Sequence, residues 1–343
     1  MHHHFSFDPP GYGRSKSGLK VPRYEFRSAP EFCAGITNLG SADYLNYVGG
    51  AKLPTLVGTT VALGLVPPPE FLALFTTQPA DDGTGGTEAT GGTYARLQIA
   101  GNAAVNAVTA AANATLHFAA TPAWIWNGSA CIAVGFYCYD ATAPSVIPAN
   151  SWIISATATT VVINNNATGA GVGAADILTF TAFATPVAAS GAEPATVPGY
   201  ETNAQAVLNF IQSTTNLGTI TSAGIYDAVT SGNLRWWDWL GNFAWKPFTG
   251  TLASPSVLTV PAHGFSNGDQ VVVSAKEGGG SLPTAGSFAG LLTVAGITTD
   301  TFNVGINAAT ASGSGEIRKV ATQAVPSGIT VTFPVNQLTL SLG

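Results

Sequence analysis

The chain has 343 residues, of which 46% are hydrophobic and only 9% are charged. This is enough apolar material for two or three small domains, and it argues against extensive disorder. The net charge of −6 argues against nucleic acid as a partner, because phosphate binding needs clustered cations. The three cysteines form no CxxC pair, so neither a disulfide framework nor a zinc site is expected.

Residues 1–54 are predicted to form an irregular arm, because proline and glycine interrupt every helix or strand pattern there. Residues 1–30 hold five cations and two acidic residues, a net charge of +3, so the rest of the chain carries −9. The cations are Arg14, Lys16, Lys20, Arg23 and Arg27. Two interpretations stay open: a strap that docks on an acidic protein surface, or an ordinary solvated tail.

Membrane insertion and secretion are not expected. The apolar stretch at 57–66 is too short to cross a bilayer, and three prolines follow it. The chain starts with Met-His-His-His rather than with an apolar leader, so no cleavable signal peptide is predicted.

From about residue 55 onward, short apolar or alternating runs bounded by Gly and Pro predict β-strands. The predicted strands are 59–66, 71–77, 94–99, 114–119, 130–139, 151–155, 159–164, 176–185, 219–227, 233–239, 257–260, 269–275, 290–295, 300–306, 316–320, 328–333 and 337–342. Helix signals are confined to the alanine-rich 102–114 and to 202–210, where Thr202 could be a cap. This pattern predicts an all-β fold with a β-sandwich or jelly-roll-like body, inserted β-domains and at most one or two short helices.

The loop at 79–88 (PADDGTGGTE) is acidic and rich in glycine, which permits the positive φ of tight turns. Asp81 and Asp82 can accept hydrogen bonds from backbone amides of the loop. Arg96 can bind a carboxylate through two nitrogens, and Glu88 is the nearest candidate. We interpret these four residues as a structural loop lock rather than a catalytic set.

Two sequence blocks resemble a family of tailed-phage structural proteins commonly labelled tail fibre or minor virion protein. The block from Leu72 to Arg96 follows the pattern LALFT…P…D…GGTE…GG.YAR. The block at 217–236 (LGTITSAGIYD…SGNLRW) follows GTITHFGIFD…GGNLL.W, with Ser222-Ala223 in place of the histidine position. The resemblance covers about half of the chain and implies a virion assembly protein.

A third segment, AHGFSNGDQV at 262–271 with LLTV at 291–294, resembles a small β-barrel module. Phage proteins use this module, which also resembles a domain of ubiquitin-activating enzymes. The stretch here has no cysteine, so it cannot form a thioester. Together the resemblances imply an arm at 1–54 and a body at 55–250. The body has a β-rich insertion at 101–210, and a small inserted β-barrel at 251–320 precedes C-terminal strands at 321–343 that complete the body.

Enzymatic alternatives have weak support in the sequence. A glycosidase needs two carboxylates about 5–9 Å apart; the candidates are Asp81, Asp82, Glu88, Asp140, Asp227 and Asp238. Nearly all lie in turn contexts, where Asp is favoured for hydrogen bonding alone. Two metal sites are conceivable, but neither has a recognised ligand spacing. One is a Ca²⁺ site at Asp81, Asp82 and Glu88. The other is a metal bound by His2, His3 and His4 around a trimer axis. No catalytic residue, cofactor or metal is therefore expected.

The densest aromatic run is 234–248. On a strand, Trp237 and Trp239 share one face, whereas Trp236 and Asp238 share the other. The favoured interpretation is a two-sided core strand. The alternative is an intersubunit or glycan-stacking surface that would include Trp245.

The sequence thus predicts a non-enzymatic structural protein of a phage virion, assembled in the host cytoplasm. Its expected partners are the major capsid protein or neck and tail proteins of the same virion, together with copies of itself, most simply as a trimer. Neither nucleic acid nor membrane is an expected partner. Three roles stay open: a capsid decoration or cement protein, a fibre or collar protein at the neck or tail, and a host-glycan adhesin or depolymerase.

Overall fold

The computed structural model describes residues 12–14, 20–22, 69–80, 83–140, 146–184, 200–241, 243–274, 282, 288, 290–307 and 313–341. Every regular element in these ranges is a β-strand, which confirms the all-β prediction. The strand expected at 59–66 lies outside the described residues.

Of the basic arm, the structure describes only one antiparallel hairpin. It consists of β1 (Tyr12–Arg14) and β2 (Lys20–Pro22). Arg14 and Lys20 pair across this hairpin, while Lys16, Arg23 and Arg27 lie outside the described residues. The docking role of the arm therefore stays a prediction.

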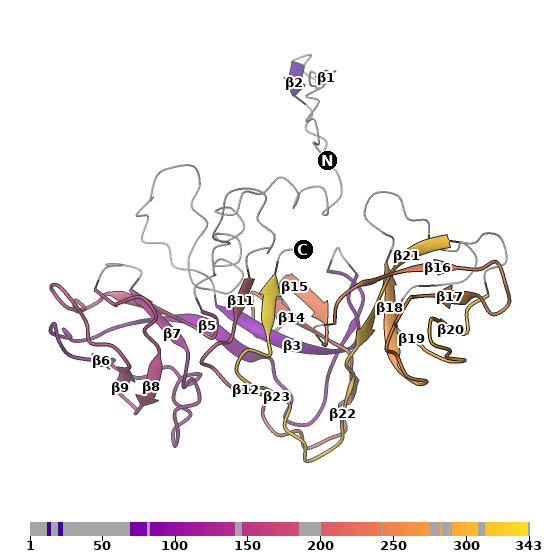
Figure 1. The fold of residues 1–343 in the computed structure, drawn as a ribbon. Coiled ribbons are helices and arrows are strands. Elements are labelled where there is room, and N and C mark those ends of the chain that lie inside the picture. The colour runs from indigo at the N-terminus through magenta and orange to yellow at the C-terminus, as the bar shows by residue number, and fades with distance from the viewer. Residues whose placement is uncertain are drawn as a thin grey trace.

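A seven-stranded antiparallel sheet occupies the centre of the molecule (Figure 1). Its order is β15-β14-β3-β5-β10-β7, and β4 pairs with β3. The strands are β3 (Glu70–Thr77), β4 (Thr87–Glu88), β5 (Leu97–Ala104), β7 (Tyr137–Asp140), β10 (Ile177–Thr181), β14 (Ser222–Tyr226) and β15 (Leu234–Trp239). The first six residues of β3 are buried, as expected for an apolar run that is covered on both faces.

The region expected as an insertion, 101–210, shares the central sheet and its core. It contributes β7 and β10 to that sheet, together with a three-stranded sheet of β6 (Thr115–His117), β9 (Thr160–Ile163) and β8 (Ile153–Ala156). Leu116 and Phe180 of this region belong to the same hydrophobic cluster as Leu72. We call this cluster the main core.

The helix signal at 102–114 does not correspond to a helix in the structure. β5 continues to Ala104, and backbone hydrogen bonds to a later segment of the chain keep the next residues extended. The Val105 amide donates to the Asp176 carbonyl at 3.0 Å, and the backbones of Thr109 and Val172 exchange two hydrogen bonds of 2.9 Å. Val105 and Thr109 are themselves buried. β-Branched residues with such partners favour extended backbone over a helix.

The helix expected at 202–210 is also wrong, because this stretch pairs with the C-terminal strands instead. β11 (Tyr200–Thr202), β12 (Leu208–Asn209) and β13 (Gly218–Ile220) pair in turn with β24 (Thr339–Ser341), β23 (Thr332–Phe333) and β22 (Gln323–Val325). The fully buried Asn203 side chain donates to the carbonyls of Ala206 and Pro334 at 2.8 Å and accepts from the Leu338 amide at 3.0 Å. This buried amide anchors the extended C-terminal segment.

A second sheet, on the right in Figure 1, has the order β19-β18-β21-β16-β17-β20. The strands are β16 (Lys246–Gly250), β17 (Val257–Thr259), β18 (Gln270–Ser274), β19 (Leu292–Thr293), β20 (Thr301–Asn303) and β21 (Gly313–Val320). Ala295, just after β19, exchanges two backbone bonds of 2.8 and 2.9 Å with Asn303 and so closes the sheet into a small barrel. Its core, which includes Val271, Phe302 and Ile317, is separate from the main core.

The HGFSNGD segment forms a corner of this barrel. His263 is 4% exposed; one ring nitrogen accepts from the Phe265 amide at 2.9 Å, and the other lies 3.0 Å from the Thr298 carbonyl. Its ring stacks on Phe265 and meets Phe302 edge-on. With both nitrogens engaged, His263 has a structural role.

Candidate functional site

Arg96 is the centre of a polar cluster that joins the loop after β3 to the β14–β15 hairpin. Its Nε and Nη2 donate to both carboxylate oxygens of Glu88, at 2.7 to 3.2 Å. Its Nη1 donates to the carbonyls of Ala228 and Ser231 at 2.8 and 2.6 Å. The guanidinium also lies 3.4 Å above the centre of the Tyr226 ring. We call Glu88, Tyr94, Arg96 and Tyr226 the arginine clamp.

Tyr94 completes the arginine clamp. Its hydroxyl donates to Glu88 at 3.1 Å and accepts from the Leu74 amide of β3 at 3.0 Å, while its ring stacks on Phe210. Burial, followed by the nearby Glu88 carboxylate, raises the pKa of this hydroxyl above its usual value. Tyr94 is therefore neutral and acts as a fixed hydrogen-bonding link.

The glycines of the loop adopt the backbone that the sequence predicted. Gly86 has φ of +70°, and a Cβ there would lie 2.8 Å from the Pro79 nitrogen. Only glycine fits this turn without a backbone shift. Asp81 and Asp82 lie outside the described residues, so the structure joins only Glu88 and Arg96 of the four expected lock residues.

Asp227 organises the turn of the β14–β15 hairpin. It accepts from the Asn233 amide at 2.7 Å and the Asn233 side chain at 2.9 Å, and it pairs with Arg235 at 3.0 Å. Burial acts to raise the pKa of Asp227, but the Asn233 hydrogen bonds and the Arg235 charge hold it below its usual value. A carboxyl that stays ionised is unsuited to be a general acid.

The expectation of a two-sided core strand at 233–239 is wrong. All six residues of β15 are only half-buried. Among the described residues β15 pairs only with β14, so it is an edge strand. Trp236 alone of its three tryptophans packs against the main core. Trp237 and Trp239 do share a face, with their rings edge-to-face and their centres 5.9 Å apart.

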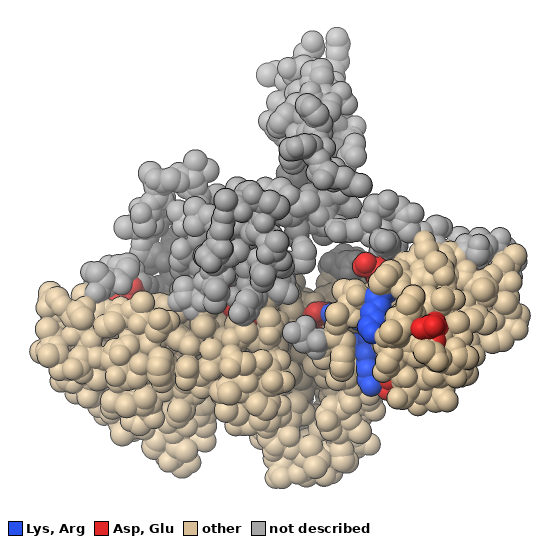
Figure 2. All heavy atoms as spheres, in the orientation of Figure 1, with Lys and Arg blue, Asp and Glu red and all other residues tan. Residues whose placement is uncertain are grey.

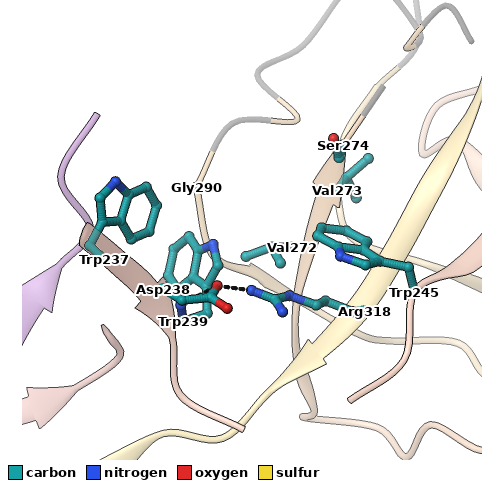
Figure 3. Close-up of a pocket in the computed structure, with 9 residues that line it drawn as sticks. All are labelled: Trp237, Asp238, Trp239, Trp245, Val272, Val273, Ser274, Gly290 and Arg318. Carbon is teal, nitrogen blue, oxygen red and sulfur yellow. Dashed lines mark hydrogen bonds and ion pairs between the residues drawn. The ribbon is translucent and has the colours of Figure 1, made fainter. Parts of the chain in front are cut away.

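These two tryptophans line a groove of about 370 Å³ between β15 and the small barrel (Figure 3). Its lining residues are Trp237, Asp238, Trp239, Trp245, Val272, Val273, Ser274, Gly290 and Arg318. We call it the tryptophan groove. Arg318 of β21 forms an ion pair with Asp238 across the groove and lies 4.9 Å from the centre of the Trp245 ring. Its side chain is 11% exposed, and its Nε has no hydrogen-bond partner among the residues that the structure describes.

The remaining sequence candidates do not gather into a site. Glu88, Asp227 and Asp238 are each bound to a different arginine, and Asp140 is buried in β7. Among the described residues there is no group of three or more His, Cys, Asp or Glu placed to hold a metal. No helix in the same residues could span a membrane.

The structure leaves two of the three cysteines as free thiols. Cys138 is buried in the main core and Cys131 packs against it, while Cys33 lies outside the described residues. Burial raises the pKa of both thiols, so neither has the character of a reactive thiolate.

Sequence reasoning missed Arg318, Val272 and the other barrel residues of the groove. The alternation of β21 marks Arg318 as facing away from the barrel core, but no local pattern places it opposite Asp238. It also missed Glu70 and Glu201, two buried carboxyls whose oxygens have no hydrogen-bond partner among the described residues. Comparison with known proteins adds no assignment: the chain matches no family model, no curated protein and no solved structure.

Proposed function

We propose that the chain is a structural protein of a tailed-phage virion that binds the capsid or the neck and tail surface of the same particle. It would act as a decoration or cement protein, or as a fibre or collar protein, and would stabilise or extend the particle. The observation that carries this proposal is that the motif residues bind other parts of the same chain. Glu88, Arg96 and Asp227 of the two sequence blocks hold loops to the central sheet, which suits a scaffold better than a reaction centre.

The surface supports an assembly role. In the face shown in Figure 2 the described residues are almost entirely uncharged, apart from one short band of Lys and Arg with a few acidic groups. Association through such a surface immobilises few long, flexible side chains and so loses little conformational entropy. The outer edge of β15 has no strand partner among the described residues and offers backbone groups for strand addition by a neighbour. A symmetric homo-oligomer, such as a trimer, fits this mode of binding.

The basic arm supplies a direct test of docking. A chain without residues 2–30 should fold normally but lose most of its binding to particles, and a full-length chain with the five arm cations replaced by Gln should bind with weaker salt dependence. Binding is measured by co-sedimentation with particles that lack the protein, and circular dichroism controls for folding. Unchanged decoration by the truncated chain would show that the arm is a solvated tail.

A host-glycan adhesin is a second candidate, and the tryptophan groove is the observation that favours it. A depolymerase is less well supported, because the described candidate carboxylates are held in ion pairs or buried rather than facing one another across the groove. A depolymerase would be established if the wild-type chain released sugar from host polysaccharide and the Asp238→Asn variant did not.

A further inference from the structure

The tryptophan groove combines aromatic walls with one charged pair, and this combination points to a class of ligand. Trp237 and Trp239 approach from β15, and Trp245 lies at the opposite side, immediately before β16 (Figure 3). Trp245 is 40% exposed, which is unusual for the largest apolar side chain. One exposed and two half-buried indole rings that converge on one hollow are typical of a binding surface.

The polar groups of the groove lie between these rings. Asp238 forms the ion pair with Arg318, and its carboxylate also accepts a hydrogen bond from the Trp239 amide at 2.7 Å. The Arg318 side chain is almost nine-tenths buried, and within the described ranges its Nε lacks a hydrogen-bond partner. A buried donor without a partner is unfavourable, and a ligand acceptor or a bound water would remove that penalty.

We propose that the tryptophan groove binds a pyranose ring of a saccharide. A pyranose presents a flat patch of C–H bonds that packs on an indole ring, and its rim of hydroxyls can both donate to Asp238 and accept from Arg318. The volume of about 370 Å³ lies at the lower end of the range for small-ligand sites, which suits one or two sugar rings.

Other ligand classes fit the groove less well. A polyanion such as nucleic acid would be repelled by Asp238 and by the net charge of −6. Arg318 could not compensate, because it is already paired with Asp238. A purely apolar peptide would bury the Asp238–Arg318 pair without offering it hydrogen bonds, which is costly. A saccharide can pack its C–H face on the indole rings and also form hydrogen bonds with the charged pair. This inference names the ligand class for the adhesin candidate proposed above, and it can be tested on the purified chain independently of the virion role.

The test screens the full-length chain on an array of bacterial capsular and O-antigen saccharides, followed by titration of the bound members with intrinsic tryptophan fluorescence and saturation-transfer NMR. Trp245→Ala should weaken binding about tenfold or more, and Trp245→Phe, which keeps a ring, should lose less. Phe243→Ala is the matched control, because Phe243 is two residues away and equally exposed, at 41%, but does not line the groove.

Three outcomes would overturn the proposal. The first is absence of binding across the whole array. The second is unchanged affinity in Trp245→Ala, or an equal loss in the Phe243→Ala control. The third is a Trp245→Ala chain that binds no less saccharide but changes its oligomeric mass in light scattering, which would make the groove a contact between protein subunits.

Discussion

The free energy of unfolding is expected to fall by several kcal/mol as the pH is raised from 5 to 8, because two carboxyls are buried without hydrogen-bond partners in the described part of the chain. Glu70 starts β3 in the central sheet and is 0% exposed, and Glu201 lies in β11 and is 1% exposed. Burial raises the pKa of Glu70 to about 8, with the Arg235 charge opposing and the Asp227 charge assisting this shift. Burial raises the pKa of Glu201 to about 9.

The sign of the effect follows from proton linkage. Well below pH 4.5 both carboxyls are protonated in the folded and in the unfolded chain, so they impose no penalty. Above pH 4.5 the unfolded chain loses these protons while the folded chain retains them, and each group then lowers stability by about 1.4 kcal/mol per pH unit. The decline ends where the folded carboxyls themselves ionise, near pH 8 for Glu70 and near pH 9 for Glu201.

Urea unfolding at pH 5, 6, 7 and 8 measures this dependence. Glu70→Gln and Glu201→Gln keep the shape of the side chain and remove the titration, so each should match the wild-type chain near pH 5 and exceed its stability at pH 8 by several kcal/mol. The double variant should have the flattest profile. A wild-type stability that rises over this range, or a double variant with the wild-type slope, would contradict the assignment.

Arg96→Met is expected to destabilise the chain by about 3–5 kcal/mol, because it leaves a partly buried carboxylate without its counter-charge. The Arg96 side chain is 8% exposed and that of Glu88 is 24% exposed. The substitution also removes two bonds to the carbonyls of Ala228 and Ser231, which tie the β14–β15 turn to the loop. Arg96→Lys should recover little, because an ammonium cannot reproduce the planar fork.

A double-mutant cycle with Glu88→Gln separates the ion pair from the other contacts of Arg96. The combined variant should be more stable than the sum of the two single changes predicts, because neither charge is left alone. Lys319→Met is the matched control: it also breaks an ion pair, with Asp269 at 2.8 Å, but Lys319 is 34% exposed and the loss should stay below about 1 kcal/mol. Equal losses at Arg96 and Lys319 would show that the arginine clamp has no special role.

Features of the fold that depend on local pattern were predictable from the sequence. Prolines at 69 and 79 flank the apolar run that becomes β3, and its apolar residues, 71–75, are all buried. The pairing of Arg96 with Glu88 was within reach for the same reason, since the two residues are eight positions apart and a glycine-rich turn reverses the chain between them.

Features that depend on distant partners were not predictable. Thr202 resembles a helix cap, but the neighbouring Asn203 binds Pro334, which is 131 residues away, and this contact holds the segment extended. The tryptophans of β15 resemble a core pattern, yet the strand lies at a sheet edge and faces Arg318, 80 residues from Asp238. Periodicity indicates which side chains share a face, but the partner of that face is set by tertiary packing.

The most direct test of the proposed virion role is quantitative mass spectrometry of gradient-purified virus particles from a culture that expresses the chain. We predict that the chain co-purifies with particles at a fixed ratio to the major capsid protein, on the order of hundreds of copies for a cement protein and about a dozen for a collar or fibre. Finding it as a free monomer in the cytosol of infected cells, and absent from purified particles, would contradict the proposal.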